Sequence, residues 1–354
     1  MLDTGGIGTY LAELLPRIVA SMDEARFTLL GDEALLRRLL PSSSRVAIRS
    51  FDVPIYSVRE QLAFVGSIPR DTTLFWSPHF NIPLGFHGPL AVTVHDVAHL
   101  ALPQSSLARR AYATWMFSAV RRRAAIVFCD SAFTAAEFTR RVGAPRELKV
   151  CHLGVAPRWF EPDDTPPPLG EPYFLYVGNV KPHKNLGRLL DAFAGVAPAT
   201  GHRLVIVGRR DGMRTIDHHV AERAAALGEC IVYTGYVSPE ELERYVRGCD
   251  ALVLPSLYEG FGLPPLEALA CGRAVAVSNA ASLPEVCGPV AEYFDPLDDA
   301  SIAAALIRLA HRAPDSADVI ARRRDWARQF DWETCATATV AGFKRAMAAH
   351  DGHR

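Results

Sequence analysis

The chain has 354 residues, 49% of them hydrophobic and 22% charged, and a formal net charge of −1; such a composition predicts a soluble globular protein of two domains. The near-neutral balance gives no reason to expect nucleic acid as a partner, and no apolar run is long enough to span a bilayer. Seven cysteines without a C-x-x-C pair or zinc-type spacing predict a cytoplasmic protein with reduced thiols and no metal site.

The sequence opens with a glycine turn, Gly5 to Gly8, that leads into a helical pattern. Glycines before a helix leave backbone N–H groups open to a phosphate or a sugar, although an ordinary turn explains the pattern equally well. Only Met1 to Thr4 precede the turn, and they are too few and too polar to form the strand that a βα unit needs. We therefore expect the native protein to carry about ten more residues upstream.

Short apolar runs then alternate with helical stretches. The predicted strands are 27–30, 46–48, 73–76, 90–94, 125–128 and 148–152, and the predicted helices are 34–40, 59–65, 107–122 and 133–141. This alternation predicts a parallel, doubly wound sheet, in which ligands bind beyond the carboxyl ends of the strands. His79 and His95 fall at such ends, although a lone histidine there is more often a hydrogen-bonded structural residue.

The composition changes between Glu161 and Pro172, where five prolines stand among few apolar residues. Such a stretch is typical of a semi-rigid linker. The predicted domains are therefore 1–160 and 173–330, joined by 161–172, and residues 331–354 form a C-terminal helix that packs back on the first domain.

The second domain repeats the alternation. Its predicted strands are 173–178, 204–208, 231–237, 251–254 and 274–277, with a helix from Leu186 and a loop at 282–286. Ser238 and Glu241 have the spacing of a capping box. Lys184 lies in the turn after the first of these strands, where an ammonium group can neutralise a diphosphate.

The segment 255–267 reads as the end of a buried strand, a turn with two glycines and a helix that begins at Pro264. A helix start presents unpaired N–H groups that can bind an anion. Glu259 lies in the turn and Glu267 in the first helical turn, where the helix dipole alone also favours an acid. A phosphate site flanked by two acids suits a sugar nucleotide.

With its glutamates eight residues apart around Gly-Phe-Gly-Leu, this string resembles the E-x7-E signature of the retaining glycosyltransferases of the GT4 family. The opening glycine turn and the Pro-His-Lys-Asn string at 182–185 are similar to two further elements of that family, which often has an arginine where His183 stands here. The His-Asp pair at 95–96, together with Ser-Pro-His-Phe-Asn-Ile-Pro at 77–83, resembles the subgroup that transfers mannose or a related hexose from a GDP-sugar.

The resemblance implies an α/β protein of the GT-B fold, with two facing Rossmann-like domains and the active site in the cleft between them. It implies a cytoplasmic, metal-independent and cofactor-free hexosyltransferase of polysaccharide biosynthesis. The donor would be GDP-mannose or a related GDP-sugar, and the acceptor a growing glycan or a lipid-linked oligosaccharide. The implied partners are these two substrates and, peripherally, the inner membrane face, with no nucleic acid.

By the same resemblance, Lys184 binds the donor diphosphate, Glu259 the donor hexose, and His95 reaches the donor sugar; these three are the predicted catalytic residues. The other predicted donor-binding residues are Gly8, Gly178, Gly208, Tyr236, Gly260, Phe261, Gly262, Leu263 and Glu267. The predicted acceptor-side residues are Gly6, Ile7 and His79. Two alternatives stay open: a catalytically inactive GT-B subunit, which should have lost Glu259 or Lys184, and a sugar-nucleotide epimerase, which should lack the glutamate pair.

Overall fold

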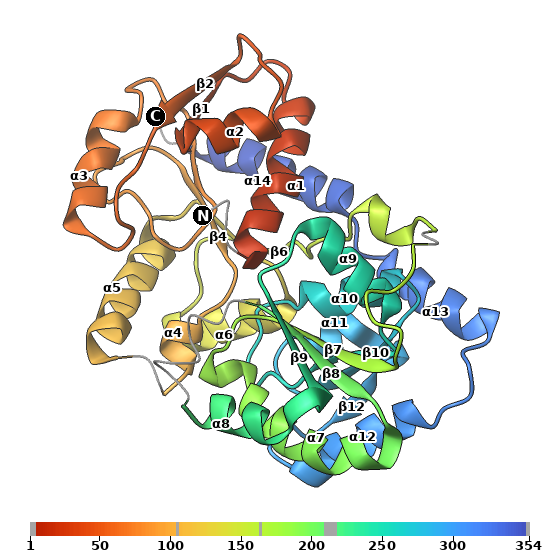
Figure 1. Ribbon diagram of the computed structural model, residues 1–354. Helices are drawn as coiled ribbons and strands as arrows, with labels where there is room; N and C mark the ends of the chain where they lie inside the picture. Colours follow the sequence, from red (N-terminus) through yellow and green to blue (C-terminus); the bar gives the residue numbers. More distant parts are fainter. Residues whose placement is uncertain (1–4, 104–105, 163–164, 209–217, 352–354) are drawn as a thin grey trace. The chain divides into compact units, whose positions relative to one another are not determined.

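The computed structural model describes residues 5–103, 106–162, 165–208 and 218–351 (Figure 1). The chain divides into two compact units, one formed by Met1–Gly154 with Asp331–Arg354 and the other by Val155–Phe330. Parallel strands alternate with helices in both units, which confirms the predicted α/β architecture. No described helix is long and apolar enough to cross a membrane.

The first unit has two parallel sheets. One consists of β1 (Phe27–Gly31) and β2 (Val46–Ser50), and the other has the order β3 (Phe75–Ser77), β4 (Leu90–Val94), β5 (Ile126–Cys129), β6 (Leu148–Val150). β4 and β5 are buried along their whole length, as expected for parallel strands that are covered on both faces. Polar side chains at their carboxyl ends are therefore held by a rigid sheet.

Helices surround these sheets. They are α1 (Gly5–Ser21), α2 (Glu33–Leu39), α3 (Val58–Ser67), α4 (Ala98–Ala101), α5 (Leu107–Arg123), α6 (Ala132–Val142) and, from the end of the chain, α14 (Trp332–Asp351). α14 contacts α1, β4 and β5. Gly342 allows the helix to lie close to the sheet, because a Cβ atom there would be 2.5 Å from the ring of Phe128.

The opening glycines are not a turn before a helix, as predicted, but part of the helix. α1 begins at Gly5, whose φ of +65° suits glycine, so Gly6, Ile7 and Gly8 lie in its first turns. Burial of one helix face, including Tyr10 and Leu14, outweighs the low helix propensity of these glycines. Residues 1–4, on which the expectation of an absent first strand depends, lie outside the described residues.

The second unit is a six-stranded parallel sheet covered by helices. Its strand order is β12 (Glu292–Phe294), β11 (Ala274–Ser278), β10 (Ala251–Leu254), β7 (Tyr173–Val177), β8 (Arg203–Val207), β9 (Ile231–Gly235). Its helices are α7 (Leu186–Thr200), α8 (His218–Ala226), α9 (Pro239–Gly248), α10 (Leu263–Ala270), α11 (Leu283–Cys287), α12 (Asp299–Ala310) and α13 (Ala317–Ala327). On one face, Phe174 and Tyr176 of β7 pack with Phe193 of α7 and Leu306 of α12, two helices that lie side by side (Figure 1).

The second unit begins earlier than the predicted linker. The Val155 N–H donates to the Phe330 carbonyl at 3.0 Å, and the short 3-10 helix η1 (Pro157–Phe160) contacts α10. Trp159 is buried there, and Arg247 donates to the carbonyl of Glu161 at 2.8 Å. These contacts hold the chain on the second unit before the prolines are reached, so the division falls at 154/155 rather than at 160/161.

Several further predictions are wrong in detail: the strand predicted at 148–152 ends at Val150 (β6), and the strand predicted at 231–237 ends at Gly235 (β9). The strand predicted at 73–76 is β3 at Phe75–Ser77, because pairing with β4 rather than the apolar run sets its ends. The loop predicted at 282–286 contains the short helix α11. The capping box of Ser238 and Glu241, the start of α7 at Leu186 and the bounds of β10 are as predicted.

Candidate active site

Glycines end three neighbouring strands of the second sheet. Gly178 follows β7, Gly208 follows β8 and Gly235 ends β9; the Gly178 N–H donates to the Val207 carbonyl at 2.9 Å, and the Gly208 N–H to the Gly235 carbonyl at 3.0 Å. A Cβ atom at Gly208 would lie 2.1 Å from the Gly178 oxygen, so a larger residue does not fit. Three neighbouring strands thus end in glycine at the carboxyl edge of the sheet, and Tyr236, which follows Gly235, is 69% exposed.

Lys184 and Glu259, 75 residues apart, form an ion pair. The Lys184 Nζ lies 2.6 and 2.8 Å from the two Glu259 carboxylate oxygens, and their side chains are 22% and 11% exposed. Lys184 ends the 3-10 helix η2 (Pro182–Lys184) after β7, and Glu259 follows β10, the neighbour of β7 in the sheet. The structure therefore brings two of the three predicted catalytic side chains together.

Hydrogen bonds fix the loops that carry this pair. The Leu257 N–H donates to the His183 carbonyl at 2.8 Å, and the Ser256 hydroxyl donates to Glu259 Oε1 at 2.6 Å. The Asn185 side-chain amide donates to the carbonyls of Pro255, at 3.1 Å, and Pro296, at 2.7 Å. The Lys184 and Glu259 side chains thus extend from loops that are tied to one another.

Two buried serines donate hydrogen bonds to the backbone of the segment that contains the glycine turn. The Ser282 hydroxyl donates to the carbonyls of Glu259, at 3.1 Å, and Phe261, at 2.7 Å, and the Ser278 hydroxyl donates to the Ser256 carbonyl at 2.5 Å. Neither serine was predicted from the sequence. The only signal for Ser282 was its place in the 282–286 loop of the family resemblance, and nothing marked Ser278.

The turn leads directly into α10. Gly260 and the buried Phe261 precede Gly262, whose φ of +115° places it in the left-handed region, and Leu263 is the first helical residue. A Cβ atom at Gly262 would lie 2.8 Å from the Leu283 side chain, so glycine is required on two counts. The helix begins one residue before Pro264. The half-buried Glu267 therefore lies in the second turn, not the first as predicted.

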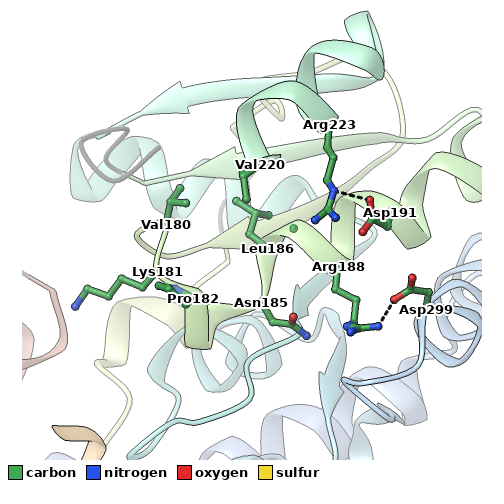
Figure 2. A pocket seen from close by; sticks show the side chains of 11 residues that line it. Val180, Lys181, Pro182, Asn185, Leu186, Arg188, Asp191, Val220, Arg223 and Asp299 are labelled. Carbon is green, nitrogen blue, oxygen red and sulfur yellow. Dashed lines mark hydrogen bonds and ion pairs between the residues drawn. The ribbon is translucent and has the colours of Figure 1, made fainter. Parts of the chain in front are cut away.

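A polar cavity of about 290 Å³ lies beside the Lys181–Asn185 turn (Figure 2). Two ion pairs frame it, Arg188 with Asp299 at 2.7 Å and Arg223 with Asp191 at 2.9 Å. Neither Lys184 nor Glu259 is among the described residues that line it. Its two arginines, like Lys184, are already paired with acids.

In the first unit, His95 joins the ends of three neighbouring strands. Its Nδ1 lies 2.6 Å from Asp130 Oδ2, after β5, and its Nε2 lies 2.9 Å from the Pro78 carbonyl, after β3. A carboxylate and a carbonyl are both acceptors, so this arrangement favours a ring that donates from both nitrogens, the imidazolium form. Burial opposes this charge, but the Asp130 carboxylate and the two hydrogen bonds outweigh it and raise the pKa of His95.

His79 lies in the same cluster and has the opposite protonation state. Its Nε2 is 3.1 Å from the Tyr56 hydroxyl, and its Nδ1 accepts from the Asn81 N–H at 3.4 Å. Burial, together with the charges of His95 and His99, lowers the pKa of His79 to about 3. The first unit thus places a cationic and a neutral imidazole near each other.

Tyr10 connects α1 to the residues around His95. Its hydroxyl lies 3.0 Å from the Thr93 hydroxyl, and its ring packs edge-on against His95 with the centroids 4.8 Å apart. Gly6, Ile7 and Gly8 therefore belong to a helix anchored at the carboxyl edge of the first sheet, two turns or less from Tyr10. Among the described residues of both units, no group of three or more His, Cys, Asp or Glu side chains could hold a metal ion.

Known proteins resemble this chain over most of its length. The family described as Glycosyl transferases group 1 matches residues 157–326. O-antigen chain mannosyltransferase B of Escherichia coli is 30% identical over 285 residues, which cover 77% of this chain and 74% of that protein. The MMP alpha-(1->4)-mannosyltransferase of Mycolicibacterium hassiacum is 29% identical over 287 residues, which cover 75% of this chain and 67% of that protein.

Solved structures show the same fold. Anabaena HepE, in complex with UDP and glucose, has a TM-score of 0.75 at 18% identity, with 94% of both chains covered. WaaG, a glycosyltransferase involved in lipopolysaccharide biosynthesis, has a TM-score of 0.73 at 13% identity, with 96% of both chains covered. The chain is thus a glycosyltransferase of the GT-B fold that acts on a glycan, and it belongs to the group 1 glycosyltransferase family.

Proposed function

We propose that this glycosyltransferase moves a mannose or a related hexose, with retention, from a GDP-sugar to a growing glycan or a lipid-linked oligosaccharide. The mannosyltransferases named above, at 30% and 29% identity, support the choice of sugar. The observation that carries the proposal is the pair of Lys184 and Glu259, in loops at the same end of the second sheet as Gly178, Gly208 and Gly235. One side chain suits a diphosphate and the other suits sugar hydroxyls.

Charge develops on the leaving diphosphate as its bond to the sugar C1 breaks. The Lys184 ammonium and the N–H groups at the start of α10, those of Gly262 and Leu263, stabilise that charge. Glu259, released from Lys184 by the incoming phosphate, accepts hydrogen bonds from the donor hexose. Glu267 accepts them from the ribose, and Tyr236 contacts the base beside Gly178 and Gly208.

Retention follows from front-face attack. The acceptor oxygen bonds to C1 on the face from which the phosphate oxygen leaves, and the acceptor proton passes to that phosphate oxygen. His95 acts as a fixed cation in this scheme, because both of its N–H groups are already donated to Asp130 and Pro78. The neutral His79, with Gly6 and Ile7, lies on the acceptor side.

We further propose that the enzyme works in the cytoplasm with a peripheral contact to the inner membrane face. The seven cysteines are all free thiols, which supports a reducing compartment. A lipid-linked acceptor would be reached from that side of the membrane.

A donor panel tests the proposal. GDP-mannose, UDP-glucose and dTDP-glucose are offered with a mannose-terminated oligosaccharide, and the product and its anomeric configuration are determined by NMR. Turnover is expected with GDP-mannose and an α-linked product, whereas a preference for a UDP- or dTDP-sugar, or inversion, would refute it. Lys184→Ala should lose most activity. Lys181→Ala, a lysine of the same turn whose side chain extends away from the pocket drawn in Figure 2, is the matched control.

A further inference from the structure

A stack of aromatic rings runs from the core of the first unit to its surface and ends in Tyr56. Phe117 of α5 is buried and stacks on Phe80, with the ring centroids 4.4 Å apart and the ring planes at 26°. Phe80, only 5% exposed, stacks in turn on Tyr56, at 5.7 Å and 19°. Tyr56 itself is 38% exposed. Its ring is therefore covered on the Phe80 side, and the surface that it offers to solvent lies elsewhere.

The backbone of Tyr56 is strained. Its φ is +61°, in the left-handed region, which a bulky aromatic residue rarely adopts. Glycine would take up this conformation without strain, yet the chain holds a tyrosine here. Strain of this kind persists only where the surrounding structure maintains it, and it gathers at positions that bind ligands.

A buried carboxylate holds Tyr56 in this conformation. Glu60 of α3 is 3% exposed, and its Oε2 accepts from the Tyr56 N–H at 2.7 Å and from the Asn81 side-chain amide at 2.6 Å. The Tyr112 hydroxyl of α5 donates to the Asn81 side-chain oxygen, and the Tyr112 ring packs edge-on against Tyr56 with the centroids 5.6 Å apart. One buried acid thus supports both the loop that carries Tyr56 and a second ring beside it.

The groups around the exposed ring do not suit an anionic ligand. The Tyr56 hydroxyl lies 3.1 Å from Nε2 of His79, an imidazole that is neutral because burial lowers its pKa to about 3. Burial, and after it the charge of Asp96, raises the pKa of Tyr56, so the phenol stays protonated. The nearby His95 is already paired with Asp130. These surroundings favour a neutral ligand that carries hydroxyl groups.

The cluster also lies where such a sheet binds its ligands. His79 and Phe80 follow β3, and Asp96 follows β4, so all three lie beyond the carboxyl ends of neighbouring parallel strands. A rigid, exposed aromatic ring can bury the apolar C–H face of a pyranose, while polar groups around the ring bond to the sugar hydroxyls.

We propose that Tyr56 is the platform of an acceptor subsite, on which a neutral pyranose unit of the glycan stacks as the next member of the ring stack. His79 and Asp96 provide hydrogen-bond partners for its hydroxyls. The proposal deepens the acceptor side of the proposed function, and it rests on that function only in that the bound sugar belongs to the acceptor. Tyr56 is a binding residue, so it contributes equally to the ground state and the transition state.

Titration of the full chain with neutral oligosaccharides, without a donor, tests this. Oligosaccharides that end in mannose, glucose or galactose are the probes, and their Kd values are measured by NMR. The wild type should bind at least one of them. Tyr56→Leu keeps an apolar cover on Phe80 but loses the planar face, so it should weaken binding about tenfold. Tyr56→Phe keeps the ring and should stay within about threefold of the wild type.

The matched control is Val58→Ala, which shortens a 78% exposed side chain two residues further on and should bind like the wild type. Equal melting temperatures show that the variants are folded. In steady-state transfer, Tyr56→Leu should raise the KM for the acceptor about tenfold and leave kcat nearly unchanged. A residue that only supported the fold would not produce this division.

The proposal is overturned if the wild type binds none of the oligosaccharides, or if Tyr56→Leu binds them as tightly as the wild type does. It is also overturned if Tyr56→Leu loses affinity for GDP instead, because the ring would then stack on a base. Binding is measured without a donor, so a wrong donor or an inverted product would refute the proposed function and leave the result for this subsite intact.

Discussion

At the scale of single residues, the proposed donor site requires the ion pair of Lys184 and Glu259 to open when the diphosphate binds. The pair has two short contacts and little exposure, so it competes directly with the diphosphate for the ammonium group. Substituting the acid should therefore have opposite effects on binding of the nucleoside diphosphate and on transfer.

We predict that Glu259→Gln lowers kcat ten- to a hundredfold, because a hydrogen bond to a charged group contributes about 1.5–3 kcal/mol. The same variant should bind the nucleoside diphosphate without its sugar about tenfold more tightly, since a competing carboxylate is gone. Isothermal titration calorimetry and steady-state kinetics measure the two effects. Unchanged diphosphate binding together with near-normal kcat would remove Glu259 from the site.

The two histidines of the first unit should change the stability of the protein with pH in opposite directions. The pKa of His95 is raised, so its contribution is complete below about pH 6.5 and is lost as the pH rises through the folded value. The pKa of His79 is lowered to about 3, so stability should fall as the pH drops below about 6.5.

Melting temperatures of the wild type, Asp130→Asn and His79→Asn between pH 5 and 9 would check this. Asp130→Asn should flatten the alkaline decline, and His79→Asn should flatten the acid decline. An unchanged alkaline limb in Asp130→Asn would show that His95 is not held as an imidazolium.

At the scale of elements, α14 depends on the absence of a side chain at Gly342. A methyl group there would lie 2.5 Å from the Phe128 ring, which is 1% exposed and cannot move away. Gly342→Ala gains about 1 kcal/mol of helix propensity but should lose about 1–3 kcal/mol to overpacking. Gly195→Ala in α7, where nothing lies within 4 Å, keeps the gain alone.

Calorimetry should therefore show a lower melting temperature for Gly342→Ala and a higher one for Gly195→Ala. The two substitutions are chemically identical, so an increase in both would mean that α14 does not lie against β5 as described.

Elements with local signals were predictable from the sequence. The buried run Ala251–Leu254 is β10, and the Ser238 capping box starts α9, because short-range chemistry determines both. The family string located Lys184 and Glu259 but not their contact, which depends on β7 and β10 being neighbours in the sheet. For the same reason, the sequence did not show that Ser278 and Asp130 hold the site residues in place. The hydrogen-bond partners of a buried hydroxyl or carboxylate depend on which strands are neighbours in the sheet.

At the scale of the whole molecule, the proposed mechanism takes the charges that stabilise a donor diphosphate from one unit. Lys184 and the start of α10 both belong to Val155–Phe330, and they extend from loops joined by the bond between Leu257 and His183. A fixed ammonium group and a helix N-terminus can together stabilise a developing phosphate charge. A divalent ion would then add little further stabilisation of that charge.

We accordingly predict that EDTA leaves most of the transferase activity in place, whereas Lys184→Ala removes nearly all of it. Arg188→Gln, which breaks an ion pair beside the cavity of Figure 2 without touching Lys184, should have a much smaller effect and serves as the charge-matched comparison. Initial rates with and without added magnesium distinguish the possibilities. A complete loss in EDTA that magnesium restores would mean that Lys184 and α10 do not suffice, and that the donor enters the site as a metal complex.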